Sequence, residues 1–131
     1  MAQMSDYLEE KLINLVFRGT TFTTPGIIHL ALYSTDPTDA DIGTELEVAG
    51  SPGYARKTFT MGAPIDGTSS NDIEIMFAAA TGDWVGITHI GIRDEATAGN
   101  LLAHKALAST VNVLSGNNFR FPIGDLEATF A

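Results

Sequence analysis

Most of this chain consists of short segments in which apolar and polar residues alternate, and these segments are separated by turns rich in glycine, proline or asparagine. Such alternation places apolar side chains on one face of a β-strand. The clearest example is 84–102 (WVGITHIGIRDEATAGNLL), which holds one alternating strand, a glycine-containing turn and the start of a second strand. Many short strands at nearly regular spacing favour an antiparallel β-sandwich or jelly roll over an α/β fold.

The strands are expected from residue 27 onward. Their expected ranges are Ile27–Tyr33, Tyr54–Met61, Ile87–Arg93, Leu101–Leu107, Thr110–Leu114 and Phe119–Ile123. Two further strand faces are expected from Ile73, Ile75 and Phe77 and from Leu126, Ala128 and Phe130. Residues 34–53 contain two prolines and five acidic residues, which indicates a long surface loop.

The N-terminal segment predicts a helix. Ser5 suits its N-cap, and Arg18 followed by Gly19 suits its C-terminal end. Apolar residues at helical spacing form a stripe made of Leu8, Leu12, Leu15 and Val16, broadened by Tyr7, Ile13 and Phe17. We therefore expect one mainly β domain over residues 1–131, in which a helix (1–19) serves docking or inter-subunit contact and residues 20–131 form the β domain.

Composition and charge exclude several classes of function. There is no cysteine, so disulfides, thiolate catalysis and cysteine-based zinc sites are absent from the sequence. The net charge of −9 repels phosphate backbones, so we expect no nucleic-acid partner. No apolar run approaches the roughly 20 residues of a membrane span. The first ten residues carry three acids and no base, unlike a secretory signal, so we expect folding in a cytosol.

Few residues suggest chemistry. The three histidines, His29, His89 and His104, lie in expected strands without metal-ligand spacing, and we expect them on half-exposed strand faces. Asp36, Asp39 and Asp41 offer the hard oxygen ligands of calcium, but they lack EF-hand spacing, and a solvated acidic loop is the favoured interpretation. With no nucleophile elbow and no phosphate-binding loop, we expect no enzyme and no cofactor.

Trp84 has two interpretations. Tryptophan is enriched in binding hot spots, but it is also highly buried on average, and the core interpretation is favoured. As interface candidates we retain Tyr7, Leu8, Leu12, Leu15, Phe17 and Trp84.

The order of several short motifs along the chain carries a family resemblance. These motifs are YLE at 7–9, FRGT at 17–20, LALYSTDPTD at 30–39, GYAR at 53–56, WVGITHIGIRD at 84–94 and GNLL at 99–102. With them the chain resembles the small virion proteins of tailed bacteriophages that are commonly labelled phage tail fibre proteins. The resemblance implies a structural virion protein made in the cytoplasm of the host bacterium, and it brings no catalytic residues.

Within that resemblance the leading expectation is an exterior head decoration (cement) protein, because a short single domain can bridge capsomers but cannot reach a distant receptor. Its partners would be the major capsid protein or other virion proteins, and we expect a homo-oligomer, with a trimer favoured. The alternatives are a tail-fibre or baseplate-associated module for host binding, with recognition by residues 34–53, and a tail-tube subunit. An enzyme comes last.

Overall fold

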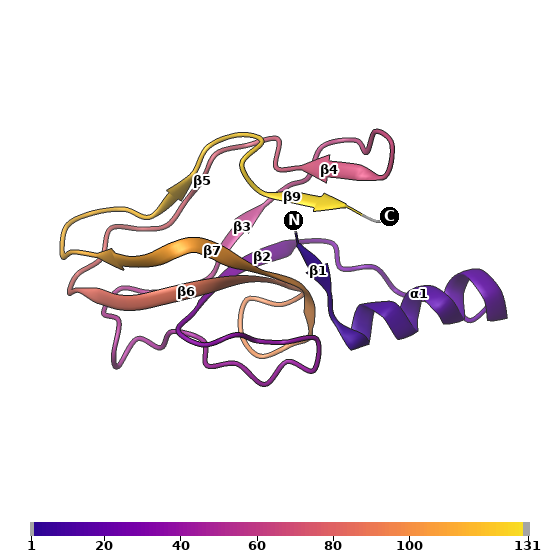
Figure 1. Ribbon diagram of the computed structural model, residues 1–131, viewed down its shortest axis with the longest axis horizontal. Helices are drawn as coiled ribbons and strands as arrows, with labels where there is room; N and C mark the ends of the chain where they lie inside the picture. Colours follow the sequence, from indigo (N-terminus) through magenta and orange to yellow (C-terminus); the bar gives the residue numbers. More distant parts are fainter. Residues whose placement is uncertain (1, 130–131) are drawn as a thin grey trace.

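The computed structural model describes residues 2–129 and has the predicted mainly β fold with one N-terminal helix (Figure 1). The elements are β1 (Gln3–Met4), α1 (Asp6–Arg18), β2 (Ile28–Tyr33), β3 (Lys57–Phe59), β4 (Thr68–Ser70), β5 (Ile75–Met76), β6 (Trp84–Arg93), β7 (Leu101–Val113), β8 (Arg120–Phe121) and β9 (Glu127–Thr129). Phe130, expected on the last strand face, lies outside the described residues.

The strands form one large sheet and two small ones. The large sheet is antiparallel with the order β1-β7-β6-β2-β3, and the small sheets pair β4 with β9 and β5 with β8. In Figure 1 the small sheets lie above the large sheet, and β3 leads from one layer to the other. Within residues 2–129 the sheets do not close into a barrel.

The hydrophobic core lies between these two layers. From the large sheet, Leu30 and Leu32 of β2 stand opposite Ile92 and Ile90 of β6, and all four are buried. From the other layer come four buried side chains, Ile75, Phe77, Phe119 and Phe121. Alternation along each strand sends these apolar residues inward and leaves the residues between them on the opposite face of the sheet.

Helix α1 begins and ends where the sequence predicts. The Ser5 hydroxyl accepts a hydrogen bond from the Leu8 amide at 3.2 Å, and Gly19 ends the helix in the left-handed conformation at φ 66°. Ser5 also anchors the helix to β7, because its hydroxyl donates to the Leu101 carbonyl. Only the first turns, with Tyr7 and Leu8, pack against the core, and the rest of α1 extends away from the sheets in Figure 1.

Strand β7 differs from the expectation of two strands, Leu101–Leu107 and Thr110–Leu114. It is continuous from Leu101 to Val113, but its register against β6 shifts strongly after Ala106. Ala106 pairs with His89 and Val111 pairs with Ile87, so the residues between them bulge out of the ladder. The predicted break is therefore real as a bulge, although the strand does not end there.

Within residues 2–129, no helix combines the length and apolar character needed to cross a membrane.

Candidate functional site

All three histidines lie on the face of the large sheet opposite the core. His29 of β2 pairs with Arg93 of β6, Tyr33 pairs with His89, and His104 of β7 pairs with Gly91. We call this surface, made of His29, Tyr33, His89, Arg93 and His104, the polar face. It is covered by the acidic loop, residues 34–53, whose carboxylates hold the loop in place.

Asp41 binds the centre of the polar face. Its carboxylate accepts two hydrogen bonds from Arg93, at 2.8 and 2.9 Å, and Arg93 also donates to the Tyr33 hydroxyl at 2.7 Å and to the Gly99 carbonyl at 2.9 Å. Burial opposes the charge of Arg93, but these hydrogen bonds and the attraction of Asp41 outweigh it and raise the pKa of Arg93. Burial raises the pKa of Tyr33 despite the nearby guanidinium. Arg93 therefore stays charged while Tyr33 stays neutral.

Glu45 forms a second attachment of the acidic loop. Its carboxylate accepts hydrogen bonds from Arg56 at 2.7 and 2.8 Å and from the Tyr54 hydroxyl at 2.7 Å. Arg56 reaches further, to the carbonyls of Glu95 and Ala98 at 2.7 and 2.8 Å, and so joins the acidic loop to the turn between β6 and β7. Burial raises the pKa of Tyr54, and the negative charge of Glu45 adds to this effect.

The third attachment reaches helix α1. The Asp39 carboxylate lies 2.7 Å from His104 Nε2, and Asp36 lies 3.8 Å from ring nitrogens of both His89 and His104. The Asp39 carbonyl accepts a hydrogen bond from the Asp6 amide, at the start of α1, at 2.9 Å. One residue of the acidic loop thus contacts both the polar face and the helix.

These pairings add to the interpretation of the calcium candidates. Asp36, Asp39 and Asp41, for which a solvated acidic loop was favoured over a cation site, remain exposed, and each also faces a basic side chain of the sheet. Within the described residues, no group of three or more histidine and acidic side chains is arranged to hold a metal ion. His29 stays apart from the other histidines, and its buried Nδ1 has no hydrogen-bond partner among the residues described. Sequence spacing gave no sign of these contacts, since they join residues 52 to 68 positions apart.

Helix α1 is the second feature of interest. Tyr7, Leu8 and Leu12 are half-buried, whereas Leu15 is 41% and Phe17 80% exposed. Ile13 (55%) and Val16 (67%) are exposed as well, and no residue of α1, all of which the structure describes, is fully buried. Four large apolar side chains on its last two turns are therefore largely uncovered by the residues that the structure describes. We call Ile13, Leu15, Val16 and Phe17 the apolar tip.

Trp84 is a core residue and not an interface residue. Its side chain is completely buried, its indole Nε1 donates to the Pro52 carbonyl at 2.8 Å, and its ring meets Tyr54 and Phe77 edge-on. A side chain in this position cannot contact a partner of the folded chain, so we remove Trp84 from the interface candidates. Trp84 is buried because it is the first residue of β6 and its side chain lies on the face of this strand that packs against the core.

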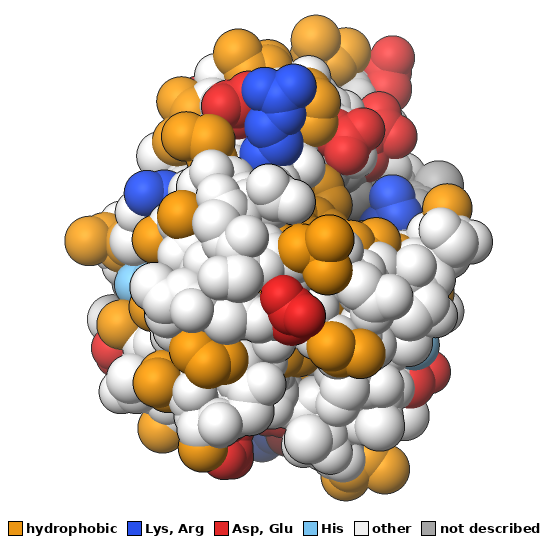
Figure 2. Space-filling view, turned by 90° about the vertical axis from the view of Figure 1, so that its left-hand side faces the viewer, with side chains coloured by type: hydrophobic (Ala, Val, Ile, Leu, Met, Phe, Trp, Pro, Cys, Tyr) orange, Lys and Arg blue, Asp and Glu red, His pale blue; other side chains and the backbone are white. Residues whose placement is uncertain are grey.

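The end of the molecule remote from α1 lacks a comparable surface. Figure 2 shows that apolar side chains are scattered there among polar atoms and backbone rather than gathered into one patch.

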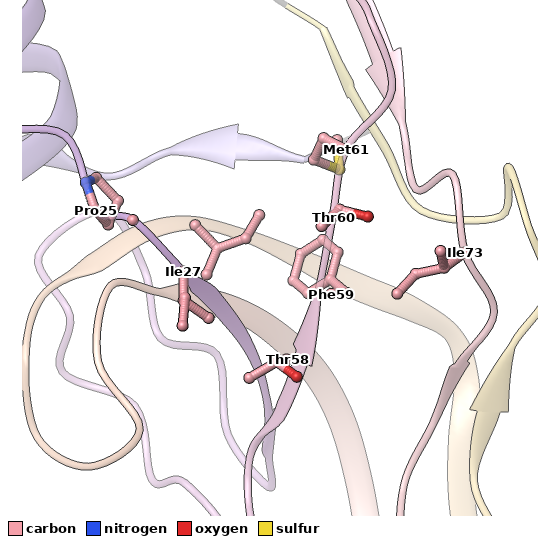
Figure 3. A pocket seen from close by; sticks show the side chains of 9 residues that line it. Pro25, Ile27, Thr58, Phe59, Thr60, Met61 and Ile73 are labelled. Atoms are coloured by element: carbon pink, nitrogen blue, oxygen red, sulfur yellow. The ribbon is translucent and has the colours of Figure 1, made fainter.

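An apolar groove opens at the β3 edge of the large sheet. Figure 3 shows its wall: Pro25 and Ile27 before β2, Phe59 and Met61 at the end of β3, and Ile73 before β5. Its volume is about 450 Å³, and all nine residues that line it are uncharged. Ile27 is 60% and Ile73 44% exposed, so the groove is open to solvent. Sequence reasoning missed the groove because its wall combines three separate segments.

Comparison with known protein families gives a match. The family model described as "Podophage GP4 fiber I protein gp80" matches residues 3–129, which is nearly the whole chain. No curated protein matches the chain.

Proposed function

The chain belongs to the podophage GP4 fiber I protein gp80 family, and from this premise we propose that it is a fibre subunit held in the virion through helix α1. As a phage fibre protein it is a structural component of the virion, and the family is not an enzymatic one. This agrees with the resemblance seen in the sequence.

The head decoration role expected from the sequence is not supported, because the matching family is one of fibres. The alternative of a tail-fibre module is better supported. The head decoration role was inferred from the short length of the chain, but a short domain can reach a distant receptor when it is part of a longer fibre.

The apolar tip of α1 is the single observation that carries the proposed attachment. Soluble proteins rarely leave large apolar side chains clustered and exposed unless another molecule covers them. Tyr7 and Leu8 fix the base of the helix on the body, so the tip projects in a defined direction. Burial of these side chains in a neighbouring virion protein would supply the binding free energy without covalent chemistry.

Particles assembled with a Phe17→Asp variant test this attachment. The charge on an exposed position leaves the fold unchanged, as circular dichroism should show, but the chain should be absent from purified particles. Val85→Asp is the matched control, because Val85 is 67% exposed and lies at the far end of the β6–β7 pair from α1. Incorporation of the Phe17 variant at the wild-type level would contradict the proposal. The same particles give the copy number relative to the major coat protein, which should be small for a fibre.

A second candidate function, recognition of the host surface, has its own support. The acidic loop is fixed by Asp41 on the polar face and by Glu45 on Arg56, yet it presents Ile42 (75% exposed) and Val48 (62%) to solvent. A loop that is already ordered loses little conformational entropy on binding. Saturable binding of the purified protein to host cells, abolished by Ile42→Asp and kept by Phe17→Asp, would support this candidate. Absence of saturable binding would refute it.

A further inference from the structure

The apolar tip of α1 and the apolar groove are two uncovered surfaces of the same chain. No residue of α1 lines the groove, although only residues 19–24 separate the helix from Pro25. In Figure 1, α1 extends away from the sheet whose edge carries the groove. The chain therefore does not bring its own tip into its own groove.

We propose that the groove receives the apolar tip of a second copy of this chain, so that Ile13, Val16 and Phe17 of one copy pack against Ile27, Met61 and Ile73 of the next. This inference rests on the proposed role of α1 in attachment and adds the identity of its partner. The two surfaces match in chemistry, because the groove has no charged lining residue in a chain whose net charge is −9.

The helix itself calls for such a partner. An isolated helix of about 12 to 15 residues is marginally stable in water, and most helical stability in proteins comes from packing of the apolar face. α1 has 13 residues, and its own domain covers mainly Tyr7 and Leu8. The groove of a second copy would provide the missing packing for the last two turns.

The area of contact indicates how the copies are arranged. A fully exposed large side chain presents roughly 200 Å², so Ile13, Val16 and Phe17 offer on the order of 400 Å² and Ile27 with Ile73 about 200 Å². One such contact falls below the roughly 1,200 Å² of a stable interface, whereas the two contacts of a reciprocal interface together reach it. The area therefore favours a reciprocal dimer, in which each copy gives one tip and receives one.

Sedimentation of the purified chain tests this exchange, in which each copy places its apolar tip in the groove of another copy. The wild-type chain should form a closed oligomer, and Phe17→Asp and Ile73→Asp should each weaken association by about 30-fold or more, the effect of losing a hot spot. Val85→Asp should sediment as the wild type does. A monomeric wild-type chain, or an Ile73→Asp variant that associates normally, would overturn the inference.

Mixing the two variants separates this arrangement from a symmetric helix–helix contact. The Phe17→Asp variant keeps an intact groove and the Ile73→Asp variant keeps an intact tip, so their mixture regains one intact tip–groove contact and should associate measurably more strongly than either variant alone. In the same way, a short bis-maleimide reagent should cross-link Phe17→Cys to Ile73→Cys in a mixture, in a chain that has no other cysteine. Cross-linking of Phe17→Cys with itself alone would refute the groove as the acceptor.

The proposed function can fail separately from this inference. Loss of Phe17→Asp from particles, together with a monomeric wild-type chain and no cross-link, would keep α1 as the attachment helix but assign its partner to another virion protein. Normal incorporation of Phe17→Asp into particles, together with stronger association in the mixture than in either variant alone, would keep the exchange and refute attachment through α1.

Discussion

Removal of the Glu45 carboxylate by Glu45→Ala should destabilise the fold by about 3 kcal/mol, the lower end of the range for breaking a buried ion pair. The Arg56 side chain is only 6% and the Glu45 side chain 22% exposed. The variant leaves Arg56 Nε and Nη2 and the Tyr54 hydroxyl without their acceptor. Arg56 keeps its bonds to the Glu95 and Ala98 carbonyls, which limits the loss.

Urea unfolding followed by the fluorescence of Trp84, the single tryptophan, measures this loss. With a denaturant dependence of about 2 kcal/mol per M, the midpoint should fall by about 1.5 M. Glu74→Ala is the matched control, because its partner Arg120 lies 3.4 Å away and both side chains are largely exposed, so it should change stability by less than about 1 kcal/mol.

Equal midpoints for Glu45→Ala and Glu74→Ala would refute the reasoning, since the two pairs differ in burial and in the number of hydrogen bonds to the carboxylate. A double-mutant cycle adds a second check. If the pair acts as a unit, the loss in Glu45→Ala/Arg56→Ala should be smaller than the sum of the single losses by at least about 1 kcal/mol.

Three further predictions follow from the core and the polar face. Burial raises the pKa of Tyr33 and of Tyr54 above the ordinary value of 10.0. The stability linked to these groups is therefore full below pH 10 and falls as the pH rises further. In an alkaline titration, part of the 295 nm tyrosinate signal should appear only when the circular dichroism signal of the fold is lost. Trp84→Ala should cost about 3 kcal/mol or more and lower the melting temperature by on the order of 10 °C, and a loss below about 1 kcal/mol would contradict its place in the core. Gly91→Ala should destabilise by about 1 to 3 kcal/mol, because its Cβ would lie 2.8 Å from Leu101 Cδ1 and Tyr33 Cε2, whereas Gly50→Ala, with no atom within 4 Å, should have no comparable effect in the same melting experiment.

Local signals in the sequence predicted the elements well wherever one segment determines its own structure. Ser5 and Gly19 set the ends of α1, and the alternation of Ile28 to Tyr33 set β2, as predicted. Strands of two or three residues such as β1 and β4 were not predicted, because they are too short to show an alternation of apolar and polar residues. The sequence did not predict that β7 continues through a bulge, because the bulge depends on the register against β6, which no local pattern contains.

The site was less predictable, because it depends on residues that meet only after folding. Neither the histidines nor the acids of residues 34–53 have a spacing that shows their pairing. The sheet register brings His89 and His104 to one face, and the loop then lays Asp36 beside both. For a similar reason, the sequence could not separate the exposed interface candidates from the buried one. Phe17 and Trp84 look equally suitable as anchors in the sequence, but Phe17 follows the last contact of α1 with the body and Trp84 begins a core strand.

Acidic and apolar residues therefore have separate uses in this chain. Asp39, Asp41 and Glu45 bind bases of their own domain, and this internal pairing keeps the acidic loop closed over the polar face. The remaining acids give each copy a net negative charge that repels other copies, but at physiological ionic strength such repulsion is largely screened beyond about 8 Å. In the proposed exchange between copies, attraction comes from a short-range apolar contact in which charge is absent from both surfaces. The apolar tip of α1 and the uncharged groove beside β3 meet this requirement.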